Sequence, residues 1–484
     1  MAIRNHALTS FLGLNTEVSD FLLKDNEATA ISNVDVDYRG YLRNRAGIDK
    51  VNDDAIAENA TVKDVLGLYG FYKDGVASYK KICAAGTKLL QFDGTDWQDL
   101  KTSLVTGGRW NFITHLNVCY GVDEKNTPQK ITESGTDYSS ANWTGLANND
   151  PPDLAPFIIE HRDRVFIAGD PDNASTVVYS TMNATPDFSN TGITGIPILK
   201  GDGQKVTGLS KLGFNLIVTK KHQIHHISGC TSADFVRRML VPGKGCFAYR
   251  SLVNTGNTII MLHDSGILNF NGQTIQDMSL NFKSKIDAIL SSYIQNACAV
   301  YKDKRYWLSY TSSGTSNDKT LVIDSVSGAC TEYDYGVNAF YLDLANNLYG
   351  ACNSGFVRQL DTETDDDGSD IDSYWQSKYL DFGAPNVTKR IKECIVYCSL
   401  ATEDLSFRFD IDHKTGGTGR QDWTKTVAPT STTVTEVRFS CSKELVGKRF
   451  RLKISHNGSE TFKVYQVIFR YEPIARRGDI ASVK

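Results

Sequence analysis

Short runs of β-branched and aromatic residues recur along most of the chain, each followed by a tight turn rich in Gly, Asp or Asn and then by a second run. Examples lie at residues 81–97, 161–180, 211–228, 257–275 and 305–335. Paired runs of this kind are typical of β-hairpins. Their recurrence at roughly 40 to 50 residues predicts the four-stranded blades of a β-propeller, because one unit cannot bury its apolar face without neighbours.

The extent of the repeat predicts how the chain is divided. A propeller with about six or seven blades is expected over residues 66–360, interrupted by a helix at Phe282–Ser292, where apolar residues share one helical face. Residues 1–65 are polar for their length, with a short helical turn expected at Glu27–Val34. We interpret them as an extended N-terminal arm, or an edge, that docks against another part of the protein.

The sharpest change in composition is the acidic run at residues 361–373, DTETDDDGSDIDS. Like charges in such a run repel one another, which favours an exposed linker. Residues 374–484 then show strands of two-residue alternation separated by turn signals, and predict an antiparallel β-sandwich with a C-terminal tail. The expected fold class is therefore all-β: an N-terminal arm, a β-propeller and a C-terminal β-sandwich.

Composition and charge exclude some classes of protein. The 484 residues include 52 basic and 56 acidic residues, a net charge of −4, so the chain lacks the positive field of a protein that grips nucleic acid tightly. Transient contact with DNA stays open. No stretch approaches the ~18 apolar residues of a membrane span, and no signal peptide is recognisable, so we expect synthesis in the cytoplasm.

The densest histidine cluster comprises His222, His225 and His226. Three imidazoles can bind zinc if they converge. On a strand, however, His225 points away from the face that the other two share, and no nearby Cys or carboxylate completes a tetrahedral set. We therefore expect a solvated strand face and no metal site.

The acidic run also contains an incomplete calcium-binding pattern. Glu363, Asp365 and Asp367 followed by Gly368 imitate the start of a calcium loop, but Tyr374 occupies the position of the final bidentate Glu. A solvated linker is the favoured interpretation, and calcium binding by this run stays open.

No complete catalytic signature is present. The Asp-box of sialidase propellers is not met, and Phe92–Trp97 suits a hairpin turn with a packed Trp. Gly243–Gly245 is a lone Gly-Lys-Gly without the rest of a phosphate loop. The basic pairs are too short to distinguish from ordinary surface; they are Lys220-Lys221, Arg237-Arg238, Lys389-Arg390 and Arg476-Arg477. We predict that the chain is not an enzyme, with no catalytic, cofactor-binding or metal-binding residues.

Both ends of the chain resemble one protein family. The start reads Phe11-Leu12-Gly13-Leu14-Asn15, continues through Ala28 and Asn33, and reaches Gly40-Tyr41-Leu42-Arg43-Asn44-Arg45-Ala46-Gly47-Ile48. The C-terminal part has Trp375, Leu380-Asp381-Phe382-Gly383, Lys389-Arg390-Ile391, Phe469-Arg470-Tyr471-Glu472-Pro473 and Arg476-Arg477-Gly478. These segments resemble the tail nozzle or hub proteins of short-tailed bacteriophages, of the tail tubular protein B or packaged-DNA stabilisation type.

The resemblance implies a structural role in the virion tail. Copies of the chain, usually six, would form a ring below the portal and adaptor that extends and closes the DNA exit channel. Expected partners are other copies of the chain, the adaptor protein, the genomic DNA in passing, and tail fibre, tailspike or needle proteins. The mild negative charge suits a conduit, because each phosphate neutralised by a protein adds affinity and slows passage.

A second hypothesis comes from a different class of protein. Propellers also bind or degrade glycans, using aromatic side chains next to convergent carboxylates. The chain offers Trp97, Trp110, Trp143 and Trp307 together with many Asp residues, although such Trp residues more often pack between blades. A tail protein that binds or degrades host surface glycans is therefore the alternative.

Overall fold

The computed structural model describes residues 2–75, 79–134, 137–145, 150–182, 184–188, 195–231, 233–412 and 422–474. Strands dominate these residues, and the α-helix among them is the five-residue α1 (Lys283–Asp287). None of the helices in these ranges has the length and apolar character needed to cross a bilayer. The expected all-β character is confirmed, as is a short helical interruption in which Phe282, Ile286 and Ile289 are buried.

Six four-stranded antiparallel sheets, here called blades 1 to 6, each consist of consecutive strands. In chain order they are β8–β11 (Val65–Phe71, Lys80–Ala85, Lys88–Phe92, Trp97–Lys101), β12–β15 (Asn111–His115, Val118–Val122, Gln129–Ser134, Asp137–Asn142), β16–β19 (Phe157–His161, Arg164–Ala168, Thr176–Tyr179, Ile196–Pro197), β20–β23 (Val206–Leu212, Asn215–Lys220, Gln223–Ser228, Val236–Pro242), β24–β27 (Val253–Asn254, Ile259–His263, Gly266–Phe270, Ile275–Asp277) and β28–β31 (Cys298–Lys302, Arg305–Tyr310, Lys319–Asp324, Cys330–Tyr333).

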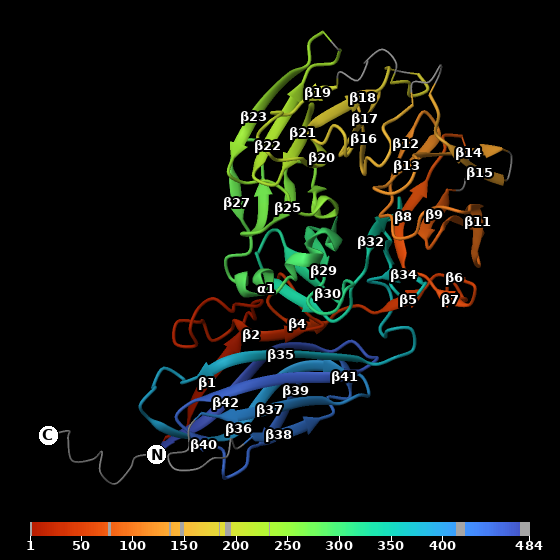
Figure 1. Ribbon diagram of the computed structural model, residues 1–484. Helices are drawn as coiled ribbons and strands as arrows, with labels where there is room; N and C mark the ends of the chain where they lie inside the picture. Colours follow the sequence, from red (N-terminus) through yellow and green to blue (C-terminus); the bar gives the residue numbers. More distant parts are fainter. Residues whose placement is uncertain are drawn as a thin grey trace.

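A seventh sheet, blade 7, closes the ring. It contains β32 (Ala339–Leu342), β33 (Leu348–Ala351), β34 (Val357–Leu360) and, from the start of the chain, β5 (Ile48–Lys50). The first strand of each blade contacts the first strand of the next, and β32 returns to β8 (Figure 1). This closed ring of four-stranded sheets is the arrangement of a β-propeller, with the larger of the two blade numbers that the repeat predicts.

The last blade therefore joins the two ends of the ring. Strand β5 pairs with β34 so that Ile48 lies opposite Leu360 and Lys50 opposite Arg358. Between β5 and blade 1 lies a small hairpin of β6 (Ala57–Glu58) and β7 (Thr61–Val62). Part of the predicted arm therefore supplies the outer strand of a blade.

Two further sheets form what we call the C-terminal unit. One has the order β3-β4-β42-β36-β39, with β1 paired to β42 and β40 to β36; the other has the order β2-β35-β41-β37-β38. The strands are β1 (Arg4–Thr9), β2 (Ala28–Ser32), β3 (Val34–Val36), β4 (Leu42–Asn44), β35 (Ile371–Leu380), β36 (Thr388–Leu400), β37 (Leu405–Ile411), β38 (Asp422–Val427), β39 (Ser431–Ser440), β40 (Val446–Gly447), β41 (Phe450–Gly458) and β42 (Lys463–Ile474).

Side chains of both sheets share one apolar cluster. Phe407 and Phe409 of β37 lie against Phe439 of β39 and Phe469 of β42, at ring distances of 5.5 and 6.1 Å. The arm adds strands to each sheet, so the helical turn expected at Glu27–Val34 is wrong. This segment is extended because β2 pairs with β35 and buries Ile31, a tertiary contact that local propensity does not report.

Candidate functional site: the axial cavity of the propeller

A cavity of about 220 Å³ lies where the inner strands of the propeller converge. Residues of at least five blades line it: Leu68, Tyr69, Trp110, Asn111, Phe112, Leu209, Tyr249, Arg250, Leu252, Cys298, Ala299, Ala339 and Phe340. This convergence puts the cavity on the axis of the ring. The described lining contains one cationic side chain and no carboxylate.

That cation, Arg250, crosses the axis. It lies in a short 3-10 turn before β24, and its guanidinium donates to backbone carbonyls of other blades. One Nη donates to Asn338 O at 2.8 Å, and the other donates to Leu66 O at 2.7 Å and Trp110 O at 2.6 Å. Because these carbonyls belong to blades 7, 1 and 2, a single side chain ties the inner strands together.

Two guanidinium groups, those of Arg250 and Arg109, interact at the cavity, and the carboxylates of Glu124 and Asp64 lie near Arg109. Burial, followed by repulsion from Arg109, lowers the pKa of Arg250 to about 10, so the guanidinium remains charged at neutral pH. Burial also lowers the pKa of Arg109, and a buried Nη1 of that residue has no hydrogen-bond partner. A positive site without carboxylates in its lining suits polar or anionic ligands.

Aromatic rings form part of the cavity wall. Phe112 stacks on Tyr69 with ring centroids 5.9 Å apart and on Trp110 at 5.9 Å. Tyr249 contacts Phe157 at 4.6 Å. Flat aromatic faces next to polar groups are the surfaces on which sugar rings stack, so the wall offers a platform of that chemistry.

Trp97, Trp110, Trp143 and Trp307, considered above as glycan-binding residues, differ in their surroundings. Trp110 lines the cavity, whereas Trp143 is 1% exposed and packs on Tyr120 at 4.3 Å. Trp307 packs on Tyr333, and Trp97 packs on Phe92 within blade 1. All four are buried in the core, and Trp110 also lines the cavity. Their sequence context does not distinguish Trp110 from the other three.

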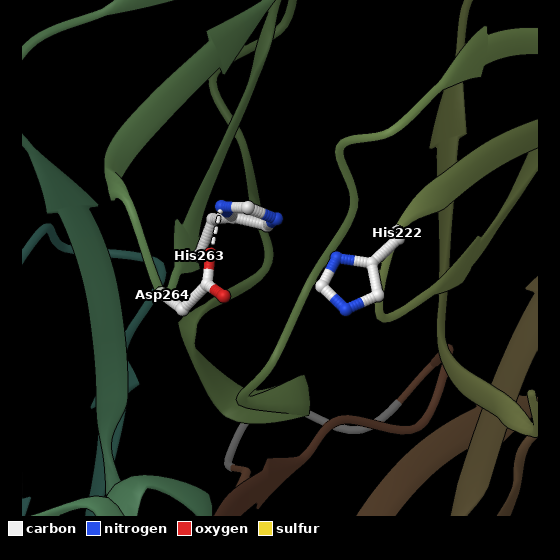
Figure 2. Close-up of side chains that lie close together, drawn as sticks. All are labelled: His222, His263 and Asp264. Carbon is white, nitrogen blue, oxygen red and sulfur yellow. Dashed lines mark ion pairs between the residues drawn. The ribbon is translucent and has the colours of Figure 1, made fainter.

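The three clustered histidines do not converge. His225 is buried on β22, where its Nε2 lies 2.9 Å from Gln223 Oε1, and burial lowers its pKa to about 4. His226 is half-buried and occupies the next position along the strand. His222 lies in the turn before β22, and its ring is 5.6 Å from that of His263 on blade 5 (Figure 2). No sequence signal links His222 to His263, because the two lie in different hairpins.

The acidic run is exposed at residues 362–364 and 368–370, but three of its carboxylates are paired. Arg45 holds Asp366, Lys50 holds Asp367, and Lys302 holds Asp361. Cationic side chains of the arm and of blade 6 thus form ion pairs with carboxylates that were expected to face solvent or to bind calcium. The run is an attached segment between blade 7 and the C-terminal unit.

Among the remaining sequence candidates, two lysines are buried, so the expectation of an ordinary solvated surface is wrong for them. Gly243 has a φ of +81°, as a turn requires. Lys220 is buried and pairs with Asp202 at 2.8 Å, and Lys389 is buried and donates to three backbone carbonyls. The pair Arg476-Arg477 lies outside the described residues.

Comparison with known proteins gives no family. No protein-family model matches the chain, and no curated protein matches it. Among solved structures, the extracellular domain of BT4673 from B. thetaiotaomicron, assigned as a one-component system, is similar at 10% identity and a TM-score of 0.44, covering 89% of this chain and 62% of that one. YCF48 bound to a D1 peptide is similar at 9% identity and a TM-score of 0.39, covering 69% of this chain and 98% of that one.

A third similar structure corrects one prediction. The exo-β-1,3-galactanase of Phanerochaete chrysosporium has 9% identity and a TM-score of 0.27, covering 68% of this chain and 98% of that one. The galactanase is an enzyme, so the prediction that this chain is not one is contradicted. The structural similarity is too low to assign that enzyme's activity or substrate to this chain. None of the three is a bacteriophage tail protein.

Proposed function

We propose that the chain is a structural protein of a short-tailed virion, a nozzle or hub in which six copies form a ring below the portal and adaptor. In this proposal a β-propeller forms the wall of each subunit, and the C-terminal unit, a β-sandwich, carries the docking surfaces. The ring extends and closes the channel through which DNA is ejected.

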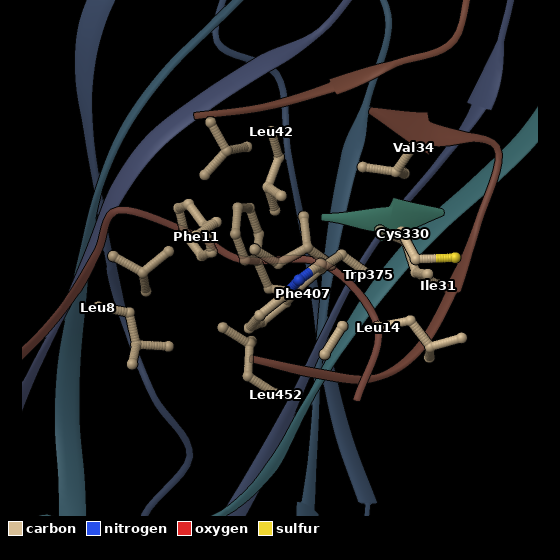
Figure 3. Packing of buried hydrophobic residues seen from close by; sticks show 14 of the residues in the cluster. Leu8, Phe11, Leu14, Ile31, Val34, Leu42, Cys330, Trp375, Phe407 and Leu452 are labelled. Atoms are coloured by element: carbon tan, nitrogen blue, oxygen red, sulfur yellow. The ribbon is translucent and has the colours of Figure 1, made fainter. Parts of the chain in front are cut away.

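The observation that carries this proposal is that the two ends bearing the family resemblance are built into one unit. Phe11 packs edge-on against Trp375 at 5.1 Å, and the Trp375 indole donates to Leu12 O at 3.3 Å. Leu8 on β1 lies opposite Val467 on β42. The arm and the C-terminal strands therefore enclose a common core (Figure 3).

A second support is the firm junction between the C-terminal unit and the propeller. Asp35 of the arm is 3% exposed and accepts from Arg43 at 3.2 Å, from Arg305 at 2.9 Å and from the Tyr333 hydroxyl at 2.5 Å. Burial opposes ionisation of this carboxyl, but the two guanidinium groups hold its pKa below the usual range. Removing one partner from a buried ion pair of this kind is strongly destabilising, so the contact resists separation of the two parts.

The axial cavity limits where DNA can pass. At about 220 Å³ and crossed by Arg250, it is far too small for duplex DNA. The proposed channel therefore lies between subunits of the ring, and the net charge of −4 favours weak contact with the passing polymer.

The deciding experiment is the oligomeric state. We expect native mass spectrometry and negative-stain microscopy to give closed six-fold rings, alone or with the adaptor protein. A protein that remains a monomer under both conditions would contradict the proposal. DNA binding tighter than ~10⁻⁶ M at physiological salt would argue against a passive conduit.

The axial cavity favours a second candidate, a tail protein that binds or degrades host surface glycans. Its aromatic wall and its cation suit an acidic sugar, while glycoside hydrolysis commonly uses a pair of carboxylates, which the described lining lacks. Binding to acidic polysaccharides should fall at least tenfold in Trp110→Leu and stay unchanged in Trp97→Leu. Equal binding by both variants would exclude the cavity, and release of sugar would indicate hydrolysis.

A further inference from the structure

We propose that His222, His263 and Asp264 form a binding site for a divalent transition-metal ion between blades 4 and 5. His222 lies in the turn between β21 and β22, and Asp264 lies in the turn between β25 and β26. One ligand atom of each of the three residues lies within 4.8 Å of the others (Figure 2). The two hairpin turns occupy equivalent positions on neighbouring blades, so an ion held there would join the blades.

The state of His263 points to a missing ligand. This residue is 4% exposed, and its Nδ1 lies 2.7 Å from the Asp264 carboxylate, 2.8 Å from Ser265 Oγ and 3.1 Å from Ser265 N. Its Nε2 is buried and has no hydrogen-bond partner, on the side of the ring that faces His222 (Figure 2). Metal-binding histidines commonly donate one ring N–H to an oxygen acceptor and ligate through the other nitrogen. With its proton on Nδ1, where the Asp264 carboxylate and Ser265 Oγ can accept, His263 would present Nε2 to the ion.

Neighbouring groups support the same geometry. The Phe247 ring packs nearly perpendicular to both imidazoles, at 5.4 Å from His222 and 5.2 Å from His263, and fixes their orientation. The positive charge of Lys244 opposes a cation here, and Asp277 offsets it together with Asp264.

The donor set selects the class of ion. Imidazole nitrogens suit Zn²⁺, Ni²⁺, Co²⁺ and Cu²⁺, whereas Ca²⁺ and Mg²⁺ prefer sets of oxygen atoms. With the two imidazoles as ligands and the Asp264 carboxylate beside Nδ1 of His263, water would complete the coordination. Because the ligands come from two blades, the ion binds the folded chain and raises its apparent stability.

The test uses the purified full chain, freed of metal by a chelator, and Zn²⁺ as the probe. We expect saturable binding of one Zn²⁺ per chain by calorimetry, together with a rise in Tm. His222→Ala should weaken binding at least tenfold and abolish the rise, and since His222 is only half-buried this variant should fold. Asp264→Asn should weaken binding by 10- to 100-fold, because it alters the group that orients His263.

His226→Ala is the matched control, since it removes a half-buried histidine from the same blade without touching the site. It should bind Zn²⁺ like the wild type. No binding by the wild type, equal binding by His222→Ala, or loss of binding in His226→Ala would each overturn the proposal. The visible absorption spectrum of bound Co²⁺ reports the type and number of its ligands. None of these measurements depends on whether the chain forms rings.

Discussion

Arg45 grips Asp366 through two parallel hydrogen bonds, Nη1 to Oδ1 at 2.7 Å and Nη2 to Oδ2 at 2.5 Å, across 321 positions of sequence. The Arg45 side chain is 1% exposed, and its guanidinium lies 4.9 Å from the centre of the Tyr335 ring. Arg45 belongs to the segment that ends at β5, while Asp366 belongs to the acidic run. This contact therefore fastens the arm, blade 7 and the entry to the C-terminal unit at one point.

Removing this guanidinium should destabilise the whole junction. Arg45→Met leaves Asp366 without its partner. Because the Asp366 side chain is 24% exposed, we expect the free energy of unfolding to fall by about 2–4 kcal/mol, less than the ~3–5 kcal/mol for a fully buried ion pair broken from one side. Arg45→Lys keeps the positive charge but cannot make the two parallel hydrogen bonds of the guanidinium. Its free energy of unfolding should therefore fall by less. Urea unfolding measures both, with the exposed Arg39→Met as the control. An effect of Arg45→Met no larger than that of the control would contradict the role of the contact.

The acidic run illustrates what sequence reasoning could and could not reach. Its composition correctly marks a boundary between repeat and non-repeat regions, because repulsion among like charges is a local property. The cations that neutralise it, among them Arg45 and Lys302, are distant in sequence. Their approach depends on the closure of the ring by β5, which no local pattern reports.

Closure by β5 depends on a glycine. A Cβ at Gly47 would lie 1.8 Å from the backbone oxygen of Asp365, a group that cannot move aside cheaply. Gly47→Val should therefore push β5 away from β34, at a cost of about 1–3 kcal/mol or more. Limited proteolysis and thermal unfolding should show an opened seventh blade. Asp49→Ser on the exposed face of β5 is the control, and a Gly47→Val protein as resistant as this control would count against the closure.

Arg250 provides a test of the cavity itself. Arg250→Met leaves the carbonyls of Leu66, Trp110 and Asn338 without their donor, so we expect a loss of about 2–4 kcal/mol in unfolding free energy. Since Trp110 lines the same cavity, its fluorescence should change as well. The exposed Arg238→Met should change neither quantity. A stable Arg250→Met variant with unaltered fluorescence would mean that the guanidinium does not hold the inner strands.

The candidate site was harder to predict than the fold. Alternation and turn residues are local, so the hairpins of the blades could be recognised one by one. The axial cavity gathers residues from blades far apart in sequence, and Arg250 sits in a stretch with no motif. Likewise His222 was noticed for its neighbours in sequence, whereas its neighbour in space, His263, comes from the next blade.

Acid should destabilise the propeller through His225. Burial, followed by the positive charges of Arg237 and Lys220, lowers the pKa of this residue to about 4, against about 6.5 in the unfolded chain. Between these values the unfolded state binds more protons, so stability is fully present above pH ~6.5 and declines as the pH falls toward ~4. The decline attributable to this group is on the order of 2–3 kcal/mol. We expect His225→Gln, measured by urea unfolding of metal-free protein at constant ionic strength, to lose less stability than the wild type across this range. Parallel curves for the two proteins would show that protonation of His225 does not govern the acid sensitivity.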